Sequence, residues 1–277
     1  MAFFCRNEMM RIYLNEQPIE VPADISLFDL RQQRRPDADL LIINGHPAKQ
    51  DQPLQEDDRV VLIQRGQQPR PDELDALLRA RHTPGVHDKI KQSCVGIAGV
   101  GGLGSAIAVA LTRIGIGKLV IVDYDLVEPS NLNRQQYFID QIGLPKVTAL
   151  QENLQRINPG VEIEAHQVKV TPDNICELFG QVDVLAEAFD AAEEKAMLTG
   201  NFLSKIADKP LVAGSGMAGY EPSNSIQTER LSDRLILCGD GTTAAEPGRG
   251  LMAPRVGIAA HHQANAILRL LLGEKPE

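Results

Sequence analysis

A glycine-rich segment at Gly96–Ala108, with the sequence GIAGVGGLGSAIA, contains residue types that let a protein backbone approach a phosphate. Gly99, Gly101 and Gly104 have the G-x-G-x-x-G spacing of a loop that joins a strand to a helix and binds a dinucleotide. Glycines allow the close contact, and the N-terminus of the following helix attracts negative charge. The loop therefore predicts a nucleotide site without identifying the nucleotide.

Asp123 lies 19 residues beyond Gly104, directly after the apolar segment KLVIV. At this distance from a glycine loop, an acidic side chain can accept hydrogen bonds from the hydroxyl groups of a ribose. Because NAD and ATP both carry a ribose next to phosphates, Asp123 fits either nucleotide equally.

The segment after Asp123 carries amide and cationic side chains near the expected strand ends, namely Asn131, Asn133, Arg134, Gln135 and Lys146. A dehydrogenase needs a face for the nicotinamide ring and a proton relay. Cations and amides instead suit the charges of a triphosphate. This segment therefore favours ATP over NAD.

The elements that must position these residues begin at Cys94, where apolar strands start to alternate with helices. We expect strands at 94–99, 118–123, 161–166, 183–189 and 210–214, and helices at 103–114, 146–156 and 256–272. Two shorter strands, at 225–231 and 234–238, precede a Gly-rich loop at 239–250. The alternation predicts an α/β fold, a Rossmann-like domain with a mostly parallel sheet covered on both faces.

A smaller module precedes this domain. Strands are expected at 11–14, 19–21, 40–43 and 59–63, and the capping-box spacing of Ser26 and Asp29 opens a helix through Arg35. This order describes a β-grasp (ubiquitin-like) α+β domain. The segment RGQQPRPDE at 65–73 has little to bury and reads as a linker. The expected divisions are a β-grasp domain at 10–66, a linker and leading helix at 67–80, and an ATP-binding domain at 81–277.

Four motifs together resemble the ubiquitin-activating (E1-like) superfamily, in its ThiF/MoeB/HesA branch, over about residues 81–272. They are G-x-G-G-x-G-S at 99–105, D-x-D-x-V-x-x-S-N-L-N-R-Q at 123–135, G-x-x-K at 143–146, and Asp190 after an apolar strand. The resemblance implies a homodimer of Rossmann-like domains that bind Mg-ATP. It also implies adenylation of the C-terminal glycine of a carrier protein, here a ThiS-type sulfur carrier of thiamine thiazole biosynthesis.

The resemblance further implies roles for individual side chains. Arg134 and Lys146 hold the phosphates, and Asp190 acts in catalysis by holding Mg²⁺. The implied nucleotide-binding residues are Gly101, Gly102, Gly104, Asp123, Asp125, Asn131, Asn133 and Gln135. Among them Asp123 takes the ribose, Gly101 and Gly104 admit the nucleotide, and Asn131 and Gln135 orient the phosphates. Positioned cations suit this chemistry, because attack on the α-phosphorus concentrates negative charge there as pyrophosphate leaves.

Three features depart from the family pattern. The zinc-binding C-x-x-C pairs of many relatives are absent, so no structural zinc is expected. Lys195 stands five residues after Asp190, where relatives often have Arg. Lysine keeps the positive charge but cannot form the two parallel hydrogen bonds of a guanidinium group. In the family, a segment before the ATP-binding domain supplies an arginine to the active site of the partner subunit. The corresponding segment here, RARHTPG at 79–85, aligns poorly with the family pattern, and Arg81 is the candidate for this arginine.

Composition excludes several classes of partner. The 277 residues carry a formal net charge of −9 with no basic tract, whereas nucleic-acid binding needs concentrated Lys and Arg. Neither a signal-peptide core nor 18 consecutive apolar residues occur, so we expect a cytoplasmic protein with no membrane partner. The widely separated Cys5, Cys94, Cys176 and Cys238 are each expected to be small buried side chains.

The front module resembles the ThiS-like sulfur carrier itself over residues 10–66. A carrier is activated at a free terminal carboxylate, but here the chain continues from Arg65 and Gly66 into Gln67. An amide carbonyl is not a nucleophile toward ATP, so this module is not expected to be a substrate of the domain behind it. The expected substrate is a separate carrier chain.

Three other functions stay open. An NAD-dependent oxidoreductase is favoured only by the glycine loop and Asp123. An E1-like enzyme that adenylates a tRNA base or another small acceptor is disfavoured, for tRNA, by the net charge of −9. A non-catalytic scaffold is disfavoured because Arg134, Lys146 and Asp190 are all present.

Overall fold

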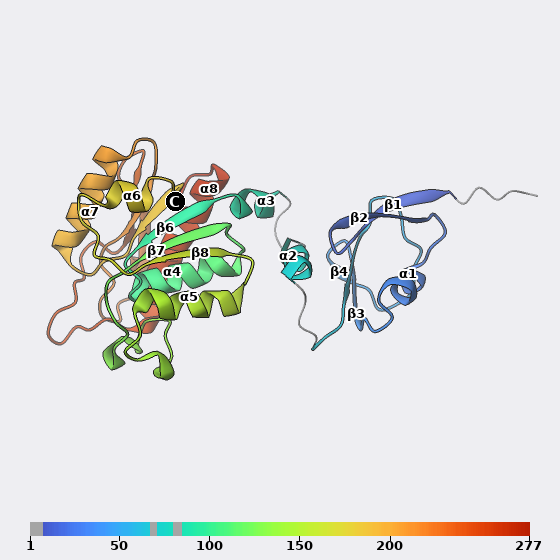
Figure 1. Cartoon of the computed structure of the whole chain (residues 1–277), viewed down its shortest axis with the longest axis horizontal. Coiled ribbons are helices and arrows are strands. Elements are labelled where there is room, and N and C mark those ends of the chain that lie inside the picture. The colour runs from blue at the N-terminus through green and yellow to red at the C-terminus, as the bar shows by residue number, and fades with distance from the viewer. Residues whose placement is uncertain (1–7, 67–70, 80–84) are drawn as a thin grey trace, which may run out of the picture. The chain divides into compact units, whose positions relative to one another are not determined.

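The structure is a computed structural model that describes residues 8–66, 71–79 and 85–277. The chain forms two compact units, with the boundary between Pro84 and Gly85, and each has its own sheet and core (Figure 1). Helix α2 (Pro71–Arg79) lies where the sequence predicts a linker and a leading helix. The rest of that predicted linker, 67–70 and residue 80, lies outside the described residues, as does the candidate Arg81.

Besides α2, the described part of the first unit contains a five-stranded sheet and one further helix, with the strand order β2-β1-β5-β3-β4. Its elements are β1 (Met9–Leu14), β2 (Gln17–Pro22), α1 (Leu27–Arg34), β3 (Leu40–Ile43), β4 (His46–Pro47) and β5 (Arg59–Ile63). The predicted capping box is confirmed, since Ser26 Oγ accepts a hydrogen bond from the Asp29 N–H at 3.2 Å. Leu27 and Leu30 of α1 are fully buried against the sheet, as a β-grasp fold requires.

The second unit contains a seven-stranded sheet in the order β11-β12-β10-β9-β6-β7-β8. Its strands are β6 (Cys94–Ala98), β7 (Lys118–Val122), β8 (Glu162–His166), β9 (Val184–Glu187), β10 (Leu211–Gly214), β11 (Gln227–Arg230) and β12 (Leu235–Gly239). All neighbouring pairs are parallel except β11 with β12. The predicted Rossmann-like, mostly parallel sheet is therefore confirmed.

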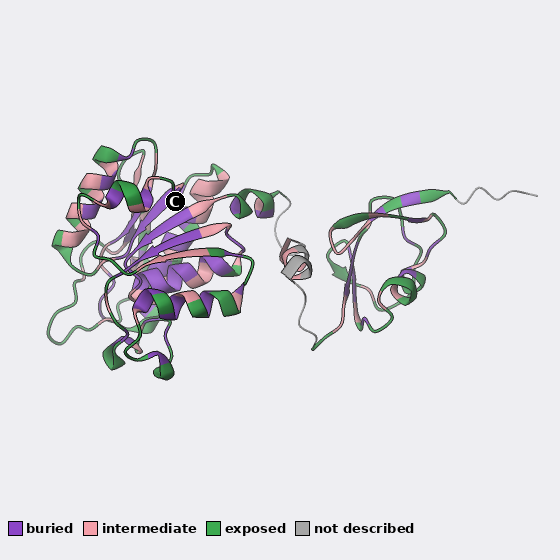
Figure 2. Cartoon of the chain, viewed as in Figure 1, coloured by how far each residue is buried: buried purple, intermediate pink, exposed green. Residues whose placement is uncertain are grey.

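Helices cover both faces of this sheet, whose strands are largely buried (Figure 2). The side chains of successive strand residues alternate between the two resulting cores. Leu119 and Ile121 of β7 pack with α3 (Val86–Lys91), α4 (Gly102–Arg113), α5 (Lys146–Ile157) and α8 (Ala253–Leu272). Val120 and Val122 pack with α6 (Ile175–Phe179) and α7 (Ala192–Lys205). A sheet buried on both faces explains why strands such as β6 and β10 read as continuous apolar runs.

The structure differs from the sequence expectations in several places. Helices α3, α6 and α7 were not predicted. Among the cysteines, Cys238 is buried as expected and Cys94 is half-buried, whereas the prediction for Cys176 is wrong because it is exposed; Cys5 lies outside the described residues. None of the described helices is both long and apolar enough to cross a membrane.

Candidate active site

A cavity of about 410 Å³ opens at the carboxyl ends of β6, β7, β9 and β10. Its lining includes the glycine loop after β6, Val122–Asp125 after β7, Ala188–Asp190 after β9 and Gly214–Met217 at the end of β10. Open α/β sheets bind their ligands in this crevice, outside the carboxyl ends of the strands. The volume lies within the usual range for a small-molecule site.

The glycine loop is so tightly folded that two of its positions cannot accommodate a side chain. Gly99 has a φ of +86°, and a Cβ atom there would lie 2.9 Å from the carbonyl oxygen of Ala188. A Cβ atom on Gly104 would overlap the carbonyl oxygen of Gly99, so Gly104 allows α4 to begin close behind the loop. Gly104 itself does not line the cavity. Its role in admitting the nucleotide stays a prediction beside this packing role.

Helix α4 points its N-terminus at the cavity. Gly101, its N-cap, and Gly102, its first residue, both line the cavity, and no side chain of the described residues caps the helix there. The first N–H groups of an α-helix have no intrahelical acceptor, and together with the helix dipole they favour a bound anion. This end of the cavity therefore suits a phosphate group.

Asp123 connects the glycine loop to the end of β7. Its carboxylate accepts hydrogen bonds from the N–H groups of Val100 at 2.8 Å and Asp125 at 2.9 Å, and the residue still borders the cavity. An acidic side chain fixed in this way is prepared to accept hydroxyl hydrogen bonds from a ribose.

Two cations line the phosphate end of the cavity. Arg134 Nη1 donates to the carbonyl of Ser130 and to Asn133 Oδ1, while its other guanidinium nitrogens have no acceptor in the part of the chain that the structure describes. Lys146, the first residue of α5, is nearly buried and forms an ion pair of 2.8 Å with Asp125. Both side chains therefore offer positive charge to a polyphosphate.

The amide side chains divide between cavity and scaffold. Gln135 lines the cavity, and its Oε1 is buried without a hydrogen-bond partner in the described chain. Asn131 instead accepts from the Glu128 N–H at 3.0 Å, and Asn133 Nδ2 donates to the Leu251 carbonyl at 3.1 Å. Neither asparagine lines the cavity and both hydrogen bonds support the loop, so direct nucleotide contacts by Asn131 and Asn133 stay a prediction.

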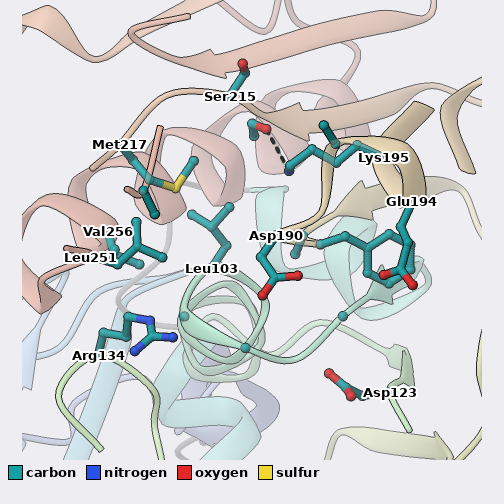
Figure 3. A pocket seen from close by; sticks show the side chains of 18 of the residues that line it. Leu103, Asp123, Arg134, Asp190, Glu194, Lys195, Ser215, Met217, Leu251 and Val256 are labelled. Atoms are coloured by element: carbon teal, nitrogen blue, oxygen red, sulfur yellow. Dashed lines mark hydrogen bonds between the residues drawn. The ribbon is translucent and has the colours of Figure 1, made fainter. Parts of the chain in front are cut away.

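Asp190 is exposed and lines the cavity after β9, and in Figure 3 its carboxylate points into this space. It has no hydrogen-bond or ion-pair partner among the residues described, and nowhere in those residues do three or more His, Cys, Asp or Glu side chains gather into a metal site. Mg²⁺ is commonly held by one or two carboxylates together with substrate phosphates. A single unpaired carboxylate facing a phosphate site fits that mode.

A buried ion pair beside the cavity was missed by the sequence predictions. Lys195 Nζ donates to both carboxylate oxygens of Glu187, at 3.1 and 3.0 Å. It also donates to the carbonyl of Gly214 at 2.9 Å (Figure 3). Burial raises the pKa of Glu187, and Lys195 acts in the opposite direction. The positive charge of Lys195 is thus compensated by the buried carboxylate of Glu187, although Lys195 borders the cavity.

The thiol of Cys238 is unsuited to nucleophilic chemistry. It is fully buried in β12, and burial raises its pKa to about 11. A reactive cysteine needs a lowered pKa and access to its substrate. This thiol is a packing side chain, as the sequence predicts.

A doubly covered parallel sheet, a glycine loop leading into an uncapped helix, and cations at the strand ends define a nucleotide-binding domain of the Rossmann type. The chain belongs to the ThiF family, whose sequence model matches residues 76–277. Residues 10–66 match a second family, the ThiS-like ubiquitin proteins.

Curated proteins match part of the chain. The chain is 38% identical over 130 residues to the adenylyltransferase and sulfurtransferase MOCS3 of Anopheles gambiae, a match that covers 47% of this chain and 29% of the relative. It is 51% identical over 85 residues to the ubiquitin-like modifier-activating enzyme 5 of Drosophila sechellia, covering 31% and 21%. The matched segments thus span less than a third of these curated relatives.

Solved structures show the same fold. The E. coli tRNA N6-threonylcarbamoyladenosine dehydratase TcdA, in complex with ATP, superimposes with a TM-score of 0.65 at 22% identity. That likeness covers 71% of this chain and 92% of TcdA.

Proposed function

We propose that the chain is an ATP-dependent adenylyltransferase that joins AMP to the C-terminal glycine carboxylate of a separate ubiquitin-like sulfur carrier. The observation that carries the proposal is the cavity, which brings together the N-terminus of α4, Arg134, Lys146 and the unpaired Asp190. Membership of the ThiF family supports the reaction class. The names of the two relatives, an adenylyltransferase and a modifier-activating enzyme, support a carrier or modifier as the substrate.

In the proposed reaction a carboxylate oxygen of the carrier attacks the α-phosphorus of ATP. The bond from that phosphorus to the bridging oxygen breaks, and pyrophosphate leaves with the electron pair. The product is an acyl-adenylate, a mixed anhydride that a sulfur donor can attack. Because no proton has to be removed from a carboxylate, the protein contributes mainly positioning and charge stabilisation.

The side chains divide this work. Asp123 accepts hydrogen bonds from the ribose, and the N-terminal N–H groups of α4, Arg134 and Lys146 hold the phosphates. Asp190 would hold Mg²⁺, which neutralises phosphate charge when bound. Gly101, Gly102 and Gln135 form the wall against the phosphates, and Asp125 orients Lys146 through the ion pair.

Further features belong to this proposal. A ThiS-type carrier of thiamine biosynthesis is our proposed substrate, because a ThiS-like domain is fused to this ThiF-family chain. We propose a homodimer by resemblance to the family. A cytoplasmic location and the lack of a nucleic-acid partner remain predictions from composition.

The test is Mg²⁺-dependent exchange of radiolabelled pyrophosphate into ATP in the presence of a separate β-grasp carrier that ends in Gly-Gly. The matched control is the same carrier with an amidated C-terminus, which removes the nucleophile and keeps the rest. We expect pyrophosphate exchange with the carrier that has a free C-terminal carboxylate and none with the amidated carrier. No exchange with any ThiS-type carrier, or equal exchange with the amidated one, refutes the proposal.

A ligand comparison separates the alternative functions. Mg-ATP should raise the thermal unfolding temperature, because a ligand at about 100 times its dissociation constant stabilises the native state by about 2.7 kcal/mol. Stabilisation by NAD rather than by Mg-ATP would favour the oxidoreductase. AMP transfer to tRNA, with none to carriers, would favour the tRNA-modifying alternative.

A further inference from the structure

One wall of the cavity has a chemistry that differs from the nucleotide-binding side. It is formed by Gly214–Met217 and Gly241–Ala245, segments of small or apolar residues without a cationic side chain. Figure 3 shows Ser215 and Met217 across the cavity from Asp123. We call these two segments the small-residue wall.

The small-residue wall offers unused backbone donors. The N–H groups of Gly216, Met217, Ala244 and Ala245 donate to no acceptor within the residues that the structure describes. Extended peptides commonly bind through main-chain hydrogen bonds of this kind. With no cation to attract phosphate, the wall suits a peptide better than a nucleotide.

The loop that carries half of this wall is organised by one carboxylate. Asp240 Oδ1 accepts from the N–H groups of Thr242 and Thr243, both at 2.8 Å, and from Thr242 Oγ1 at 3.2 Å. Its Oδ2 accepts from Thr243 Oγ1 at 2.6 Å. Thr243 Oγ1 in turn accepts from the N–H of Ala218, the residue directly after Met217, at 3.1 Å, and this bond holds the two wall segments together.

A buried arginine of α8 fixes this carboxylate. Arg255 Nη2 donates to Asp240 Oδ2 at 2.6 Å and to Ser225 Oγ at 3.0 Å. Its Nη1 donates to the carbonyls of Glu221 and Pro222, at 2.9 and 3.2 Å. One guanidinium therefore ties the wall loop to α8 and to the segment that follows β10.

The ion pair of Asp240 and Arg255 is isolated from water, with side-chain exposures of 7% and 4%. Burial alone would raise the pKa of Asp240, but hydrogen bonds from Thr243, Thr242 and Arg255 outweigh it and hold that pKa far below its usual value. A buried pair is weak evidence for stability alone, since apolar residues can replace such pairs without loss. Neither residue lines the cavity, so the pair has no direct part in the nucleotide chemistry.

Close backbone contact adds to this fixed geometry. A Cβ atom on Gly216, whose φ is +78°, would overlap Asp240 Oδ1, and one on Gly239 would overlap the carbonyl of Ser215. The Asp240 N–H donates to the Gly216 carbonyl, and the Gly241 N–H to that of Ser215. The two wall segments therefore hold a defined separation.

We propose that Asp240 and Arg255 are positioning residues for the acyl substrate: they hold the small-residue wall, which binds the extended glycine-rich C-terminus of the carrier by main-chain hydrogen bonds. A Gly-Gly tail has no side chains and can lie against this wall, with its carboxylate directed to the phosphates. This inference rests on the proposed function. It predicts that the pair controls the KM for the carrier and leaves ATP binding unchanged.

Two variants test the inference in the full chain. Arg255→Lys keeps a positive charge but cannot reach all four acceptors, and Thr243→Val keeps the side-chain shape but removes the hydroxyl that joins the wall segments. The matched control is Arg230→Gln, which removes an arginine whose ion pair with Asp233 is exposed. Pyrophosphate exchange gives the KM for the carrier and kcat, and equilibrium dialysis gives the Kd for ATP.

We expect Arg255→Lys to raise the carrier KM at least about 10-fold and Thr243→Val several-fold, because each loses hydrogen bonds that hold the wall. The kcat and the Kd for ATP should change by less than about threefold, and Arg230→Gln should match the unmodified protein. Direct binding of the amidated carrier should weaken in parallel with KM.

An unchanged carrier KM in a folded variant overturns the inference, as does an equal loss of ATP affinity. If Arg255→Lys fails to fold, Thr243→Val decides. Absence of exchange by the unmodified protein is a different result, since it refutes the proposed function rather than the role of the pair.

Discussion

Replacing Lys195 by Met removes the cation that compensates a carboxylate beside the cavity. The Glu187 side chain is 1% exposed, accepts two hydrogen bonds from Lys195 and accepts a third from the Phe189 N–H at 2.7 Å. Methionine keeps most of the lysine stem but leaves this carboxylate buried without a counter-ion. Breaking one partner of a buried pair costs about 3–5 kcal/mol, so the free energy of unfolding at neutral pH should fall by about that amount.

The pH dependence of this loss has a definite sign. Burial already raises the pKa of Glu187, and loss of Lys195 raises it further. A carboxyl group with a raised folded-state pKa contributes stability that is fully present below its unfolded pKa of about 4.3 and is lost as pH rises through the folded pKa. The destabilisation by Lys195→Met should therefore shrink as pH is lowered from about 8 towards about 5.

Urea unfolding across this pH range measures the effect, and hydrogen exchange detected by mass spectrometry assigns it to β9 and β10. The matched control is Lys169→Met, which breaks an exposed ion pair with Glu194 and should cost at most about 1 kcal/mol. Combining Lys195→Met with Glu187→Gln should recover part of the loss, because no buried charge remains. A loss below about 1 kcal/mol for Lys195→Met at neutral pH, or one that grows on acidification, refutes the reasoning.

Three further outcomes are expected. Asp190→Asn should lower pyrophosphate exchange by at least about 10²-fold with an unchanged unfolding midpoint, and near-normal turnover would contradict its role. Gly104→Ala should lower stability by about 1–3 kcal/mol and weaken ATP binding, because its Cβ would overlap backbone, whereas Gly200→Ala in α7 meets open space and should stabilise slightly in the same thermal unfolding assay. A chain that begins at Pro71 should keep pyrophosphate exchange with a separate carrier. In the full-length protein, an AMP or sulfur adduct on a fragment ending at Gly66, seen by intact-mass measurement, would contradict the expectation that the front domain is not a substrate.

Local spacing in the sequence selects many of the residues that the fold brings to the cavity. A side chain at Gly99 would contact the backbone, Gly101 lines the cavity, and Asp123 follows at the end of an apolar strand. The asparagines show the limit of this reasoning. An amide can bind a phosphate or a backbone N–H equally well, and only the fold shows that Asn131 bonds Glu128.

Contacts between separate elements are harder to predict. Glu187 and Lys195 lie on a strand and on the following helix, and Asp240 and Arg255 on a loop and on α8, so no periodic pattern pairs them. Helix α7 escaped prediction for a related reason, since only two of its fourteen residues are buried and its apolar stripe is short. Its place follows from the need for a crossover between parallel strands.

The ion pair between Lys146 and Asp125 makes nucleotide binding an exchange of partners. If Lys146 holds a phosphate, that phosphate competes with a carboxylate already 2.8 Å from the ammonium group, and the measured ATP affinity is a difference between two attractions. Asp125 then acts as a built-in competitor that keeps a nearly buried cation compensated between catalytic cycles. Such a competitor weakens product retention as well as substrate binding, because pyrophosphate can be displaced by a group that never leaves the site.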